Sequence, residues 1–339
     1  MASFKIYKLH FTSPLHISDQ HEDYSSSLKQ VHSDTLYAAL ASCMVKMGNQ
    51  LPTDGNLGFS VSSMFPYYQH DKNSTPVYFL PMPMHTKTTQ LRDVAMAKKV
   101  KKVQWVDSTL YGTILAGQPL FDDAGKYLSC IQESYLTPTQ LPEDMSGSKE
   151  FVISEVSERV ALESRIGDKE ADPYYVDKII FRFESGLYFI ANGDTMLLDK
   201  ALNMLSVEGL GSYRNVGMGY FDYTTDEISI DLPEKANHQV ALSLFIPESE
   251  EQLTAMLNSD DVAYDFVRRG GWITTYPYTT LRKNAVYAFL SGSVFCKPTD
   301  AECVSVGKIV DLKPEAGELT PDHPIWRNGK SIMLPINIK

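Results

Sequence analysis

The sequence predicts an α+β protein with two ferredoxin-like domains, residues 1–229 and 230–339. Near the N-terminus the hydrophobic period changes from that of a strand to that of a helix, as it does at the start of a split βαβ unit. The same order of a strand, a helix and further strands returns after residue 230. A chain of 339 residues is long enough for two domains of ordinary size.

The first domain opens with an expected strand at residues 4–17, FKIYKLHFTSPLHI, in which apolar and polar positions alternate. A polar loop follows. Residues 33–48 then carry apolar side chains at helical spacing, and either Ser33 or Asp34 is a suitable N-cap. Proline, glycine, serine and asparagine are frequent in residues 52–76, which predicts a loop there.

A short strand interrupted by prolines is expected at residues 77–84, VYFLPMPM. The segment 96–106, MAKKVKKVQWV, is basic and partly helical, with Val100 and Val103 as the expected buried positions. Residues 117–149 show only a weak pattern that is rich in turn residues.

Two β-rich segments, residues 150–162 and 174–191, predict a long hairpin that is inserted into the first domain. Between them lies a polar tip, ESRIGDKEADP, at residues 163–173. An amphipathic helix is then expected at residues 197–211, and an alternating strand at residues 220–230. The glycine-rich loop that joins this helix to this strand is the most unusual feature of the domain.

The second domain begins with an expected strand at residues 238–247. SEEQLTAMLN, residues 249–258, predicts a helix with Ser249 as its N-cap. The remaining apolar segments predict strands within residues 284–295, 307–312 and 330–338.

The net charge of −11 argues against general affinity for nucleic acid. The charge is unevenly distributed, however. Residues 87–102 contain six basic side chains and one acidic side chain, whereas residues 222–261 contain ten acidic side chains and one lysine. A basic region of this kind allows local binding of a polyanion, although a lysine-rich helix face is often only solvated.

Composition gives no indication of a metal, a cofactor or a membrane. The four cysteines lack the paired spacing of a zinc site, and no apolar run approaches the roughly 18 residues that span a bilayer. The N-terminal residues alternate like a strand rather than forming the apolar core of a signal peptide. A reduced cytoplasmic protein is therefore expected.

The glycine-rich loop, GLGSYRNVGMGY at residues 209–220, matches neither common nucleotide-binding motif. A dinucleotide fingerprint would need a third glycine where Arg214 or Asp222 stands, and a P-loop would need a Gly-Lys pair followed by Ser or Thr. Glycines allow positive φ angles and close approach of a ligand to the backbone. Arg214 offers a bidentate phosphate contact and Tyr213 a ring on which a base could stack, while a loop without a ligand is the simpler alternative.

Six motifs, in order, resemble a RAMP-superfamily CRISPR subunit, the fourth subunit of the type III-A (Csm) effector complex. They cover nearly the whole chain: FTSPLHIS followed by HSDTLYAAL; MAKKVKKVQWV; SERVALESRIG followed by FRFESGLYFI; GLGSYRNVGMGYF; TLRKNAVYAFLSGSVF; and HPIWRNGKSIMLPI. The sequence departs from the family at two points. The glycine-rich loop has Arg214 as its one basic residue, and Ile166-Gly167 stands where Thr-Gly is usual.

The resemblance implies RRM-type ferredoxin-like domains and a scaffold that is not an enzyme. Such a subunit would bind the 5′ repeat-derived tag of CRISPR RNA and join the large polymerase-bearing subunit to the backbone RAMP subunits. Its hairpin would press between guide and target RNA near the start of the guide. The expected RNA-binding residues are His16, Ser33, Lys98, Lys99, Lys101, Lys102, Arg159, Arg165, Gly209, Gly211, Ser212, Tyr213, Arg214, Asn215, Gly217, Gly219, Tyr278 and Arg282.

Two other functions stay open at this point. The first is a metal-independent endoribonuclease that processes precursor CRISPR RNA, for which His16 and His32 are the candidate residues. The second is an interaction protein without RNA. The acidic segment HISDQHED, residues 16–23, is a poor metal site because it lacks helical His–Glu spacing and a fixed third ligand. If the chain is a scaffold, neither Asp19 nor Asp34 is needed for cutting target RNA.

Overall fold

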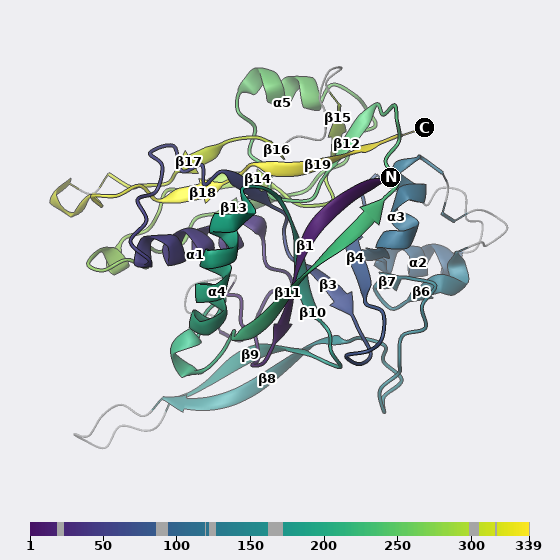
Figure 1. Ribbon diagram of the computed structural model, residues 1–339, viewed down its shortest axis with the longest axis horizontal. Coiled ribbons are helices and arrows are strands. Elements are labelled where there is room, and N and C mark those ends of the chain that lie inside the picture. Colours follow the sequence, from purple (N-terminus) through teal and green to yellow (C-terminus); the bar gives the residue numbers. More distant parts are fainter. Residues whose placement is uncertain are drawn as a thin grey trace.

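The structure is a computed structural model that describes residues 1–18, 24–85, 94–118, 120–121, 127–161, 172–297, 305–315 and 317–338. It is a mixed α+β protein, in which a large twisted sheet lies at the centre and a smaller sheet lies against it (Figure 1). In the part of the chain that is described, no helix is long and apolar enough to cross a membrane.

The large sheet has nine strands in the order β11-β1-β10-β3-β4-β5-β7-β6, with β2 paired to β10. Its pairs are antiparallel except for β5 with β7. Their bounds are β1 (Ala2–Phe11), β2 (Phe59–Val61), β3 (Phe65–Tyr68), β4 (Val77–Pro81), β5 (Trp105–Asp107), β6 (Ile131–Gln132), β7 (Tyr135–Leu136), β10 (Gly186–Gly193) and β11 (Phe221–Ile230). Strands from distant parts of the sequence therefore build the sheet.

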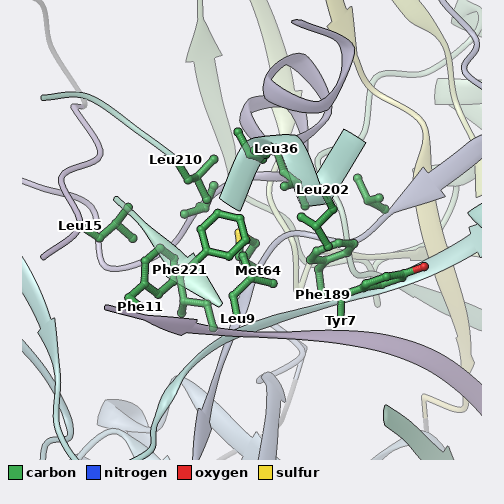
Figure 2. Close-up of a cluster of buried hydrophobic side chains, with 14 of the residues drawn as sticks. Tyr7, Leu9, Phe11, Leu15, Leu36, Met64, Phe189, Leu202, Leu210 and Phe221 are labelled. Atoms are coloured by element: carbon green, nitrogen blue, oxygen red, sulfur yellow. The ribbon is translucent and has the colours of Figure 1, made fainter. Parts of the chain in front are cut away.

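Two helices cover one face of this sheet. Helix α1 (Ser33–Lys46) and helix α4 (Thr195–Glu208) place leucines against the aromatic and aliphatic side chains of β1 and β10. Figure 2 shows Leu36 and Leu202 facing Tyr7, Leu9 and Phe189 in this core. Burial of each such side chain contributes about 1.5–3 kcal/mol, so this interface fixes the end of α4 from which the glycine-rich loop departs.

The opposite face of the sheet is also buried. Alternation along β1 directs Ile6 away from Tyr7 and into a second core, which helix α3 (Ser108–Leu115) helps to close. That core includes Val240 and Leu334 from the C-terminal half. The two halves of the chain therefore share one continuous hydrophobic core.

The C-terminal half forms a four-stranded sheet in the order β15-β12-β19-β16 and two separate two-stranded ribbons. Its helix α5 (Glu250–Met256) begins at Ser249, whose hydroxyl accepts the N–H of Gln252, as expected for an N-cap. The strands are β12 (His238–Ala241), β13 (Phe266–Arg269), β14 (Val286–Phe289), β15 (Val294–Cys296), β16 (Ser305–Val306), β17 (Ile309–Asp311), β18 (Trp326–Asn328) and β19 (Ser331–Ile336).

The expected hairpin is present as β8 (Val152–Ala161) and β9 (Asp172–Phe181), which pair in register along their whole length. In Figure 1 this ribbon projects from the body of the protein below α4 and β11. Of the expected tip, residues 163–173, residues 163–171 lie outside the described part of the chain, and residues 172 and 173 begin β9. A further α-helix among the described residues is α2 (Val94–Lys102), which contains the expected buried residue Val100, and Val103 follows it in the core.

Several expectations about secondary structure were wrong. Residues 52–76, expected as loop, contain β2 and the buried strand β3. The single strand expected over 174–191 is two strands, because the chain turns after Phe181 before β10 begins. Helix α3 was not foreseen, and α1 is capped by His32 without a side-chain hydrogen bond rather than by Ser33 or Asp34.

Candidate nucleic-acid interface

The glycine-rich loop leaves α4 at Gly209 and returns to the sheet at the start of β11. Gly211 and Gly217 both have a φ of +88°, a backbone conformation that residues other than glycine rarely adopt. A Cβ atom at Gly211 would lie 2.4 Å from the backbone oxygen of His16, whereas one at Gly217 would meet no atom within 4 Å. Gly211 is therefore needed for packing within the protein, and the space beside Gly217 is open to a ligand.

Backbone hydrogen bonds attach the loop to the segment after β1. The N–H of Ser212 donates to the oxygen of His16 at 2.9 Å, and the N–H of Gly219 donates to the oxygen of Pro14 at 2.9 Å. The end of the loop is further held where the N–H of Tyr220 donates to the hydroxyl of Ser13. The loop is thus fixed before any ligand binds, which lowers the entropic cost of binding.

Tyr213 lies at the centre of an aromatic cluster that joins the loop to the hairpin. Its backbone is left-handed, with a φ of +58°, which is unusual for a residue other than glycine. Its ring centroid lies 5.4 Å from that of His16 and 5.0 Å from that of Tyr24, and the guanidinium of Arg159 lies 5.9 Å from it. Burial raises the pKa of Tyr213 to about 12, and Tyr24 adds to the effect, so the phenol is neutral at pH 7.

His16 is buried, although the sequence predicted a position at the border of a polar loop. Its Nδ1 lies 2.8 Å from the backbone oxygen of Asp177 in β9. Because a carbonyl can only accept, Nδ1 carries the proton and the ring is fixed in one tautomer. His16 therefore connects the segment after β1 to the hairpin, and its ring also packs edge-on against the ring of Tyr213.

Arg214 extends into solvent at the outer end of the loop. Its Nη1 lies 3.9 Å from Oε2 of Glu208, which also pairs with Nζ of Lys46 at 2.5 Å. Exposed pairs of this kind contribute little to stability. The guanidinium of Arg214 is therefore available to exchange its weak contact with Glu208 for a stronger contact with a phosphate.

A buried ion cluster holds the start of α1 against the C-terminal half. Asp34 is fully buried, and its Oδ2 accepts hydrogen bonds from Nε of Arg269 at 2.8 Å and from Nη1 of Arg327 at 2.7 Å. Burial by itself would raise the pKa of Asp34, but Arg327 and Arg269 outweigh it and hold this pKa well below its usual range. Ser33 is likewise buried, and its hydroxyl accepts the N–H of Leu244. Its place inside the protein gives Ser33 a structural role rather than the surface contact expected from the sequence.

The lysines of α2, Lys98, Lys99, Lys101 and Lys102, are exposed. Figure 1 places α2 beside β6 and β7, at the other end of the sheet from α4 and the β8–β9 ribbon. The structure therefore does not bring the basic helix and the glycine-rich loop together.

Tyr278 and Arg282, both expected to bind RNA, lie in a turn of the C-terminal half that includes Tyr278–Thr280. The ring of Tyr278 packs against His323 and the cluster around Ile273, and the guanidinium of Arg282 lies 4.9 Å from the ring centroid of Trp272. Asn215 is exposed in the glycine-rich loop, and Arg165 lies outside the described residues. Within the turn of the C-terminal half, Tyr278 is packed against its neighbours, whereas Tyr276 is exposed.

Three residues of this region were not recognised from the sequence as site residues: Tyr24, Arg269 and Arg327. Tyr24 follows a polar loop that shows no periodicity, and the two arginines are far from Asp34 in sequence. The motif HPIWRNGK contains Arg327, but a motif gives no partner for its charge. Among the residues that the structure describes, there is no group of three or more histidines, cysteines and acids placed to hold a metal ion.

Comparison with known proteins agrees with the sequence motifs. Residues 234–336 match the model of the CRISPR Csm4 C-terminal domain. The chain is 26% identical over 320 residues to the CRISPR system Cms protein Csm4 of Mycobacterium tuberculosis strain H37Rv, which covers 92% of this chain and 91% of the relative.

Solved structures show the same fold. The chain is similar to a chain of the Csm3-Csm4 subcomplex of the type III-A CRISPR-Cas interference complex, with a TM-score of 0.60, 19% identity and coverage of 99% of this chain and 100% of the other. It is also similar to a chain of the Csm1-Csm4 cassette in complex with AMPPNP, with a TM-score of 0.57, 19% identity and coverage of 100% and 99%. Together with the motifs along the chain, these findings confirm its resemblance to the Csm4 RAMP subunits of CRISPR systems.

Proposed function

We propose that the chain is a non-enzymatic subunit of a type III-A CRISPR complex, in which it binds the 5′ repeat-derived tag of CRISPR RNA at the glycine-rich loop. The observation that carries the proposal is the fixed loop of residues 209–219, which offers Arg214 and the open space beside Gly217. Phosphate contacts of this kind fix the register of a strand without any chemistry.

The proposed partners follow from the relatives. A solved subcomplex contains Csm4 with Csm3, and a solved cassette contains Csm4 with Csm1. By likeness to these proteins, the chain would join the large polymerase-bearing subunit to the backbone RAMP subunits. The acidic segment 222–261 suits a contact with protein better than one with RNA.

The hairpin is proposed to press between guide and target RNA near the start of the guide. One face of the β8–β9 ribbon carries the exposed apolar residues Val156, Val160 and Tyr175. Apolar and aromatic side chains on a projecting ribbon suit stacking against bases. Toward its outer end the ribbon contacts the glycine-rich loop through Arg159 and Tyr213, so the two parts of the proposed site lie side by side.

The two ferredoxin-like domains remain part of the proposal. For residues 1–229 the ferredoxin-like fold is supported by the strand order β11-β1-β10-β3, with both α1 and α4 packed on one face of the sheet. Support is weaker for residues 230–339. Their central sheet is β15-β12-β19-β16, and α5 is the α-helix found among the described residues of that half.

The endoribonuclease alternative is less well supported by the geometry. Metal-independent cleavage needs a proton acceptor beside the reacting 2′-hydroxyl. His16 is fully buried, so its Nε2, the ring nitrogen left to accept a proton, is enclosed in the protein, and the raised pKa of Tyr213 keeps its phenol protonated. These groups are suited to packing rather than to proton transfer.

One experiment separates the three functions. Purified full-length protein is incubated with repeat RNA in EDTA, and the products are examined on native and denaturing gels. We expect a shifted band with intact RNA. Cleaved RNA would support the endoribonuclease, and the absence of both a shift and a cut would favour an interaction protein without RNA.

A further inference from the structure

A cavity of about 260 Å³ lies between α1 and the glycine-rich loop, where the two halves of the chain meet. This volume is slightly smaller than the roughly 300–1,000 Å³ of sites for drug-sized ligands. A cavity of this size suits a single nucleotide unit. The residues of its wall that matter here are Thr35 and Ala38 of α1, Gly211 and Arg214 of the loop, and Arg269 and Thr274 of the C-terminal half.

The wall of the cavity is positively charged. Arg214 and Arg269 contribute guanidinium groups to it, and no carboxylate is found among the described residues that line it. The chain as a whole has a net charge of −11, so this local sign is the reverse of the average. An anion that enters the cavity would meet two cations, and the carboxylates that pair with them, Glu208 with Arg214 and Asp34 with Arg269, are not among the residues that line it.

Arg269 is held in a fixed orientation by groups behind the cavity. Its Nε and Nη2 donate to the two carboxylate oxygens of Asp34, at 2.8 and 3.1 Å, and Nη2 also donates to the hydroxyl of Thr35 at 2.9 Å. Within the described part of the chain, these contacts leave Nη1 for a ligand. A guanidinium whose orientation is fixed by neighbouring groups binds an anion with little further loss of entropy.

Asp34 does not neutralise all the positive charge around it. Its carboxylate is shared by Arg269 and Arg327. The ammonium group of Lys283 interacts electrostatically with all three of these side chains. Burial, together with the positive charges of Arg327 and Arg269, lowers the pKa of Lys283 to about 8, and Asp34 only partly opposes this shift. Three basic groups thus converge on one carboxylate, which leaves an excess of positive charge beside the cavity.

We propose that this cavity seats a phosphate of single-stranded RNA between Arg214 of the glycine-rich loop and Arg269 of the C-terminal half. The inference rests on the proposed function and adds to it a second contact, from the other half of the chain. Arg214 can present its planar fork to two phosphate oxygens, and Arg269 can add one further donor, Nη1, because Asp34 and Thr35 hold its other nitrogens. Bound RNA would therefore bridge the two halves at a point where Asp34 already joins them.

The test introduces a carboxylate at the edge of the cavity without disturbing Asp34. Ala38 is exposed on α1 and lines the cavity, and Val45 is exposed on the same helix but does not line it. Ala38→Glu and Val45→Glu change the net charge equally. Affinity is measured by fluorescence anisotropy with a synthetic RNA that carries the repeat-derived tag of the same CRISPR locus.

We expect Ala38→Glu to weaken binding at least tenfold and Val45→Glu to change it less than twofold. Equal affinities for the wild type and Ala38→Glu would overturn the inference, as would equal losses in the two variants. If the wild type bound the tag RNA in none of these measurements, the proposed function itself would fall. The two failures are thus distinguishable.

A second measurement identifies the phosphate. Tag RNAs that carry a single neutral methylphosphonate linkage at each position in turn are bound to the wild type and to Arg269→Gln. At one position we expect the neutral linkage to weaken binding to the wild type. At that position the same linkage should not weaken binding to Arg269→Gln, because this variant already lacks the contact with the phosphate. The control is Arg268→Gln, since Arg268 is exposed on the opposite face of β13, and this variant should respond to the linkages as the wild type does. A wild-type profile without such a position would contradict the inference.

Discussion

The glycine-rich loop and the basic helix α2 were both expected to bind RNA, but the structure builds them differently. The loop has one arginine, yet it is tied by hydrogen bonds to the segment after β1 and packed against His16 and the hairpin. The helix has four exposed lysines, and its buried contacts are made by Val100 and Val103. Concentrated charge indicates where an anion is attracted, whereas a fixed loop indicates where it is held.

The largest expected effect concerns the ion cluster that supports the loop region. Asp34→Asn leaves Arg269 and Arg327 without their shared carboxylate, so we expect a loss of about 3–5 kcal/mol in the free energy of unfolding. Chemical denaturation measures this. Because the pKa of Asp34 is lowered in the folded protein, its contribution is present at neutral pH and is lost only as the pH falls below about 4.

The control for this variant is Glu234→Gln, which removes an exposed carboxylate and should change stability by less than about 0.5 kcal/mol. Equal stability of the two variants would mean that the cluster does not hold the two halves together. In that case the stability of the loop region would not depend on the buried charges of Asp34 and its two arginines.

Two glycines of the loop should respond differently to the same change. Gly211→Ala places a methyl group against the backbone of His16 in addition to the strain of a positive φ, whereas Gly217→Ala adds the strain alone, about 1–2 kcal/mol. We expect the larger fall in the midpoint of thermal unfolding for Gly211→Ala. A larger fall for Gly217→Ala would show that the open space at this position is filled in solution.

The two regions can be compared directly through RNA affinity. Arg214→Ala should weaken binding of tag RNA by about 1–3 kcal/mol at constant stability. Alanine replacement of a single α2 lysine, such as Lys98, should have a smaller effect that disappears as salt is raised, since an exposed lysine acts mainly through screened attraction. Titrations at several salt concentrations measure both. The distinction would be lost if the Lys98 variant bound more weakly than the Arg214 variant at every salt concentration.

The smallest expected effect is a pH dependence from Lys283. Its pKa is lowered by burial to about 8 in the folded protein, so the unfolded chain binds more protons between pH 8 and roughly 10.4. Stability contributed by this group should therefore rise with pH across that interval. The difference in unfolding free energy between the wild type and Lys283→Met, measured from pH 7 to 10, should increase in favour of the wild type. A constant difference would contradict the buried position of the ammonium group.

The sequence predicted the elements whose periodicity is regular, such as β1, α1, the hairpin and α4. It failed for β3, which is buried in the sheet although proline and serine surround it, because burial there is decided by strands far away in the sequence. For the proposed site, the loop and Arg214 were expected from the sequence. The contribution of Arg269 was not, since its partner Asp34 lies 235 residues away and no local pattern links them.

The central claim is that the glycine-rich loop, and not the basic helix, holds the tag RNA. Ultraviolet crosslinking of the protein to tag RNA that contains 4-thiouridine, followed by mass spectrometry of the crosslinked peptides, tests this most directly. We predict crosslinks within residues 209–220, above all around Gly217, where the loop leaves open space. Crosslinks confined to residues 94–102 of α2, with none in the loop, would contradict the account.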